Sequence, residues 1–162
     1  LLQVALHTAK HSYVRAPGFR LHSDVDRIIK FQSIDWSKFE EKVCNLEIKT
    51  AVYFSLYFAS QLIKTPIPDF VFSSLKPSWY REKMILRFIN KAGIYNQNKK
   101  KFSKIGYIVF NLALYDSIGQ NIKAIFPSYN SIKIKYPIKN KLQLPYFYFI
   151  RIKDLICKRA KL

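Results

Sequence analysis

The chain has 162 residues, of which 49% are hydrophobic and 16% aromatic. That composition excludes a disordered chain, and the length predicts one domain with a single core. The net charge is +18, of which residues 1–82 contribute +3 and residues 83–162 contribute +15. A half this basic attracts polyanions such as nucleic acid or an anionic membrane surface, and the lysine excess of an AT-rich genome produces the same pattern.

The uncharged apolar segments are too short to cross a membrane. The longest, residues 50–63, has 14 residues, whereas a transmembrane helix needs about 20. The two cysteines, Cys44 and Cys157, lie far apart and match no metal-ligand spacing, so we interpret them as reduced thiols. The sequence therefore predicts a cytoplasmic protein without a transmembrane segment.

Apolar residues recur at helical spacing along most of the chain. The predicted helices, in chain order, cover residues 1–13, 21–31, 36–46, 49–63, 70–75, 79–91, 105–116, 120–126 and 146–161. Asp35, Asp69 and Ser78 are placed to cap the third, fifth and sixth of these, and Gly93 to end the sixth. The fourth is apolar nearly all round, which predicts a central place in the core.

Two segments near the C-terminus, residues 132–136 and 146–150, resemble strands, but prolines bound both of them. The predicted fold class is therefore all-α, an irregular multi-helix bundle. We expect one domain over residues 1–162, with the core helices in residues 1–126. Residues 127–162 are expected to form a basic C-terminal extension that carries the final helix.

The three histidines lie in the first 22 residues. His7 and His11 are four residues apart, the spacing that places two side chains on one helix face and that zinc sites use. His22 and Asp24 would complete a ligand set, but Lys10 places a positive charge beside it. Three interpretations remain for the histidines: metal binding, packing in the core, and contact with an anion or nucleotide. Of these we expect metal binding least, and we predict no metal site.

Asp24 and Asp26 are separated by one residue, as in the carboxylate pair that holds Mg²⁺ in nucleotidyltransferases. That pair lies on a strand after a Gly-Ser turn, and no glycine here is followed by serine. On the helix predicted over residues 21–31, two residues apart means about 200° apart. The two carboxylates are therefore not expected to face one metal ion.

Short motifs follow one another in a defined order through the first third of the chain. They are His7-Thr-Ala-Lys-His11, Arg20-Leu21, Asp24-Val25 and Ile34-Asp-Trp36. In order and spacing they resemble the uncharacterised nucleotidyltransferase-like family of bacteria, whose members carry such motifs in the helical region after the catalytic domain. The resemblance continues through residues 51–56 and 66–68, and more loosely through residues 124–127 and the final helix.

The resemblance implies that this chain is the helical C-terminal part of such a protein, without its N-terminal catalytic domain. The first residue is already in apolar helical periodicity, with no Met or capping residue before it, which also predicts an upstream domain. Mg²⁺ and a nucleoside triphosphate are then expected only with that domain. The chain alone is expected to be inactive and to hold no catalytic residue.

Within that picture five residues are candidates for nucleotide binding. Lys10 fits phosphate contact as a point charge and Arg20 as a bidentate fork, while His7 and His11 would donate to phosphate or ribose. Asp24 would orient one of these groups. The alternative interpretation is a scaffold, in which Asp24 caps the second helix and Lys10 is solvated.

Two other functions fit the sequence. The first is a non-enzymatic binding module whose basic half docks nucleic acid or an anionic membrane surface. The second is a helical scaffold that contacts only the missing domain.

Overall fold

The computed structural model describes residues 1–13, 18–93, 102–138 and 140–157. These residues form the helices α1 (Leu2–His11), α2 (Gly18–Phe31), α3 (Trp36–Asn45), α4 (Lys49–Ile63), α5 (Asp69–Leu75), α6 (Trp79–Ala92), α7 (Lys104–Ala113), α8 (Ile118–Ile125), α9 (Tyr129–Lys135) and α10 (Leu144–Cys157), with a short 3-10 turn at Lys141–Gln143. No strand occurs among them. The fold is all-α, an irregular multi-helix bundle, as the periodicity predicts.

The helix order follows the sequence prediction, and the boundaries differ in places. α2 begins at Gly18, so Asp24 lies in its middle and the prediction that Asp24 caps it is wrong. The strand-like residues 132–136 lie in α9 and its C-terminal cap, and residues 146–150 lie in α10. The connections at residues 14–17 and 94–101, and the end of the last predicted helix beyond Cys157, lie outside the described residues.

Only some of the predicted capping residues form the expected caps. The Asp35 carboxylate accepts the Lys38 backbone N–H at 3.0 Å, which confirms it as the N-cap of α3. Asp69 is instead the first residue of α5, and Ser78 holds the N-cap position of α6 without a side-chain hydrogen bond. Gly93 ends α6 with a φ of 70°, a conformation that glycine adopts without strain.

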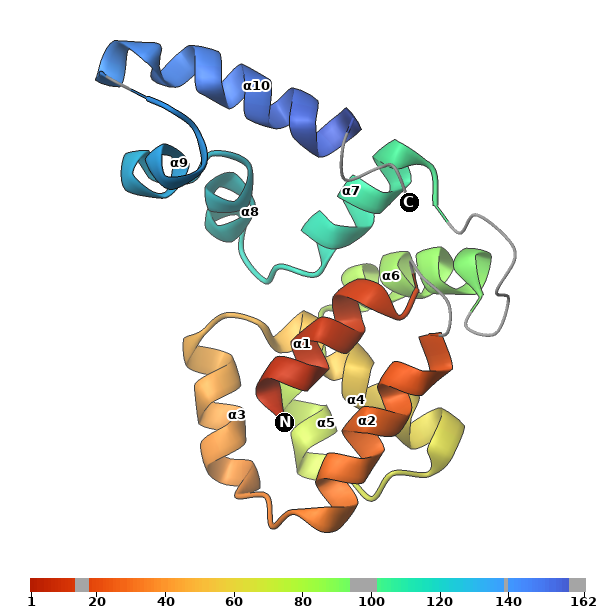
Figure 1. The fold of residues 1–162 in the computed structure, drawn as a ribbon. Helices are drawn as coiled ribbons and strands as arrows, with labels where there is room; N and C mark the ends of the chain where they lie inside the picture. The colour runs from red at the N-terminus through yellow and green to blue at the C-terminus, as the bar shows by residue number, and fades with distance from the viewer. Residues whose placement is uncertain (14–17, 94–101, 139, 158–162) are drawn as a thin grey trace.

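α4 is the central element of the main core. Residues such as Val52, Phe54 and Leu56 are completely buried, because α1 and α2 cross one side of α4 while α3 and α5 pack elsewhere along it (Figure 1). This confirms the central place that its nearly all-round apolar sequence predicts. Burial of a helix on every side fixes the positions of the helices around it.

The C-terminal helices pack differently. Phe110 of α7 and its C-cap residue Leu114 belong to the main core, whereas Ile132, Tyr136 and Ile138 form a separate small cluster against α10. Figure 1 shows α8, α9 and α10 set apart from the bundle of α1 to α5. Within the described part of the chain, no helix is both long and apolar enough to span a bilayer.

Candidate functional site

α1 is fastened to its neighbours along one face. The Thr8 hydroxyl donates to the Leu21 carbonyl oxygen of α2 at 3.2 Å, and the Ser55 hydroxyl of α4 donates to the Ala5 carbonyl oxygen at 2.5 Å. Ala5, Thr8 and Ala9 are buried as a result. These contacts fix the rotation of α1 about its axis, so its polar residues are held in a defined direction.

The opposite side of α1 carries His7, Lys10 and His11. His7 is exposed, and its ring centroid lies 4.6 Å from that of the partly buried His11. The Lys10 ammonium lies 6.0 Å from the centroid of the Tyr115 ring, at the outer limit of a cation–π contact. The structure therefore brings three of the five candidate residues together on one helix face.

Arg20 and Asp24 lie on the neighbouring helix. Both are exposed and lie one turn apart on α2. Neither Lys10 nor Arg20 forms an ion pair within the described chain. The five candidates thus lie on two adjacent helices, which the Thr8–Leu21 hydrogen bond joins.

The third histidine is a core residue. His22 is completely buried, with Nδ1 3.3 Å from the Ser55 carbonyl oxygen and Nε2 3.4 Å from the Tyr13 hydroxyl. Burial lowers the pKa of His22 to about 4, so the ring is neutral at pH 7. A carbonyl oxygen only accepts, so Nδ1 carries the proton and Nε2 accepts from Tyr13. His22 is therefore a hydrogen-bonded core residue.

The carboxylates of α2 diverge as the helical spacing predicts. Asp26 is buried, accepts the Thr65 hydroxyl at 2.8 Å and pairs with Lys30 at 3.0 Å, whereas Asp24 faces solvent. A search of the described residues finds no group of three His, Cys, Asp or Glu side chains that would hold a metal ion. Asp24 and Asp26 therefore do not form a Mg²⁺ site within the described residues.

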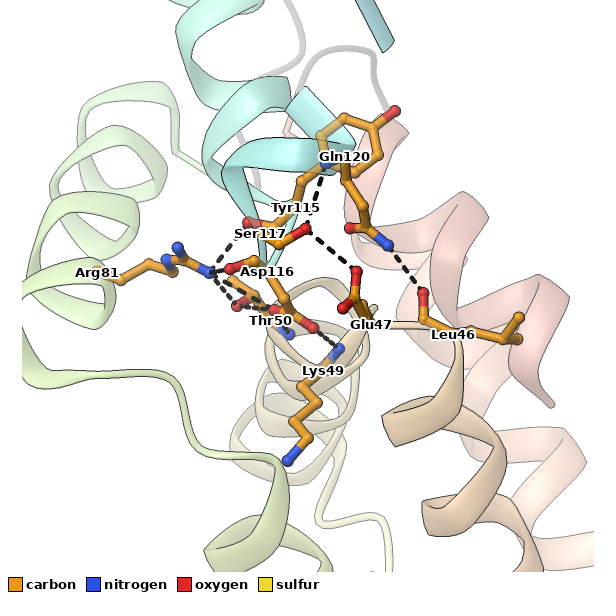
Figure 2. A network of polar contacts seen from close by, with 9 residues as sticks. All are labelled: Leu46, Glu47, Lys49, Thr50, Arg81, Tyr115, Asp116, Ser117 and Gln120. Carbon is orange, nitrogen blue, oxygen red and sulfur yellow. Dashed lines mark hydrogen bonds and ion pairs between the residues drawn. The ribbon is translucent and has the colours of Figure 1, made fainter. Parts of the chain in front are cut away.

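A polar network around Asp116, which the sequence did not predict, is shown in Figure 2. The Asp116 carboxylate, from the turn between α7 and α8, accepts the Thr50 backbone N–H at 2.9 Å, and also accepts the Lys49 backbone N–H and the Thr50 hydroxyl. Asp116 therefore caps α4 from a distance of more than 60 positions in the sequence.

Arg81 of α6 completes this network. Its guanidinium donates to the backbone carbonyl oxygens of Tyr115 and Asp116 at 3.0 and 3.1 Å, and lies 3.6 Å from the Asp116 carboxylate. These contacts hold Tyr115 against Lys10. No short-range signal marks Asp116, because a capping residue so distant from its helix matches no local motif.

Comparison with known proteins finds one family. Residues 1–64 match the model of a family described as uncharacterised nucleotidyltransferase. These 64 residues are similar to that family, and the match covers less than half of the 162-residue chain. The match covers α1 to α4, and with them every candidate residue and the central core helix. The resemblance seen in residues 66–68, in residues 124–127 and in the final helix lies beyond this match and stays a prediction.

No curated protein and no solved structure matches the chain. The similarity of residues 1–64 to the nucleotidyltransferase family therefore rests on the family model alone.

Proposed function

We propose that residues 1–64, the segment similar to the nucleotidyltransferase family, form one wall of a nucleotide cleft, which a separate catalytic domain completes. That domain would supply the metal-binding carboxylates, Mg²⁺ and the catalytic residues. The 162-residue chain alone would then show no nucleotidyl transfer. The family match to residues 1–64 supports the class of function, and the polar faces of α1 and α2 support the location.

The main support for placing the cleft at α1 and α2 is that two of its cationic side chains are not neutralised by an acidic residue in the part of the chain that the structure describes. Lys10 and Arg20 lie on helices that packing holds in place, and within the described chain neither has an acidic partner. A bound triphosphate needs positive charges that are not already neutralised, and fixed charges stabilise it more than mobile ones. His7 and His11 add two imidazoles beside Lys10 as donors to phosphate or ribose.

The test uses the protein joined to its catalytic domain. We expect Lys10→Ala and Arg20→Ala each to weaken MgATP binding about tenfold, because each removes a charge-assisted contact to phosphate. Both side chains lie outside the buried core, so the melting temperature should change little. Isothermal titration calorimetry measures the first effect and differential scanning calorimetry the second.

Lys42→Ala on α3 is the matched control, because Lys42 is an exposed lysine outside the polar faces of α1 and α2. It should leave nucleotide affinity unchanged. Unchanged affinity in both Lys10→Ala and Arg20→Ala would refute the cleft assignment, as would an equal loss in the Lys42 control.

A further inference from the structure

The outer face of α6 bears an open groove of about 330 Å³ that plays no part in the proposed nucleotide cleft. It is lined by Tyr80, Lys83, Met84, Arg87, Phe88 and Lys91. These residues share one side of the helix, because Ile85, Ile89 and Ala92 of the other side are buried in the core. We call this feature the α6 groove.

The α6 groove is strongly cationic. Lys83, Arg87 and Lys91 follow one another at intervals of four residues, which places successive charges about 6 Å apart along the helix. None of the three forms an ion pair within the described residues. Glu82, the acidic residue of α6, is engaged elsewhere, since it accepts the Tyr53 hydroxyl at 3.1 Å and pairs with Lys76 at 3.5 Å.

Aromatic rings accompany these charges. Trp79 and Tyr80, in the first turn of α6, are 70% and 71% exposed. The Lys83 ammonium lies 4.8 Å from the centroid of the Trp79 ring, so a cation and an aromatic face are already adjacent. Phe88 forms part of the wall and is itself held by Phe102, with ring centroids 6.0 Å apart.

We propose that the α6 groove binds single-stranded nucleic acid. Proteins that bind single strands combine a positively charged groove along the backbone with aromatic side chains on which bases stack, and the α6 groove has both. Its rim offers cations to phosphates and rings to bases, with no amide or carboxylate side chain lining it to read base edges. Binding is therefore expected to tolerate any sequence.

A membrane surface fits this feature less well. Lipid headgroups are contacted by a projecting apolar face, such as that of an amphipathic helix lying in the interface, whereas the α6 groove is hollowed. The net +15 of residues 83–162 adds long-range attraction for a polynucleotide. The proposal is independent of the nucleotide cleft, because none of its residues lies on α1 or α2.

The test measures the fluorescence anisotropy of labelled oligo(dT) and oligo(dU) with the 162-residue chain over a range of salt concentrations. In the triple variant Lys83→Gln, Arg87→Gln, Lys91→Gln, we expect affinity at low salt to fall by more than tenfold. The slope of log K against log salt should become shallower by about 2, because each phosphate contact on a single strand contributes about 0.7. Trp79→Ala should weaken binding about tenfold through lost stacking.

The control triple variant Lys42→Gln, Lys123→Gln, Lys133→Gln removes the same charge from exposed positions outside the α6 groove. It should lose less than about threefold in affinity. Absence of oligonucleotide binding by the native chain at low salt would overturn the proposal, and so would equal losses in the two triple variants. Circular dichroism on each variant verifies that it is folded, and Trp79→Ala provides a test that leaves the net charge unchanged.

The same variants distinguish a lipid ligand. If the native chain bound phosphatidylserine vesicles but no oligonucleotide, and the Lys83, Arg87, Lys91 triple variant abolished vesicle binding, the groove would be assigned to lipid instead.

Discussion

His22 makes the folded state sensitive to acid at the scale of a single residue. Its pKa is about 4 in the fold against an ordinary value of 6.5, so between these values the unfolded chain binds a proton that the folded chain does not. The contribution of His22 to the free energy of unfolding is therefore fully present above pH 6.5 and is lost as the pH falls toward 4. From pH 7 to pH 5 the loss is about 2 kcal/mol in the free energy of unfolding.

Urea unfolding at pH 7 and pH 5 measures this loss, and His22→Gln should remove most of it. His7→Gln is the matched control, because His7 is exposed, and it should keep the pH dependence of the native chain. An undiminished difference between the two pH values in His22→Gln would show that another group is responsible.

At the scale of elements, α4 depends on a cap that another part of the chain supplies. Asp116→Ala leaves the Lys49 and Thr50 backbone N–H groups without their acceptor and deprives Arg81 of its carboxylate. We expect a loss of about 1–3 kcal/mol in the free energy of unfolding. Thermal or urea denaturation measures the change.

Asp24→Ala is the matched control for that experiment, since Asp24 is an exposed carboxylate without a partner in the described chain. Its effect on stability should stay within about 0.5 kcal/mol. If Asp116→Ala were as mild as Asp24→Ala, the network in Figure 2 would not stabilise the docking of the α7–α8 turn onto α4.

The order of the helices was predictable from the sequence because each helix carries its own apolar periodicity. The Asp35 cap was predictable because the backbone N–H that it accepts, that of Lys38, lies three residues away. The sequence did not predict where α2 begins or that residues 132–135 are helical, since tertiary packing overrides weak local preference there. For the candidate site, the His7–His11 pairing follows from spacing along one helix. The place of Tyr115 beside Lys10 depends on long-range contacts of Arg81, which no local pattern encodes.

At the scale of the whole molecule, the polar functions proposed here lie on different helices. The residues proposed to bind nucleotide belong to α1 and α2, and the α6 groove lies on the side of the bundle that α7 joins. Because α4 contacts both α1 and α2, the core supports the two helices of the proposed wall. This wall is the central claim, and the three histidines of the chain report on it directly.

The decisive measurement is an NMR titration with MgATP of the protein joined to its catalytic domain, which follows the imidazole ring signals of His7, His11 and His22. Binding at the polar face of α1 should shift the His7 and His11 signals, while His22, which lies on the buried face of α2, should stay unchanged as an internal control. Adenosine, which lacks phosphates, should shift them much less. Unmoved His7 and His11 signals at saturating MgATP, or equal shifts of all three histidines, would contradict the account.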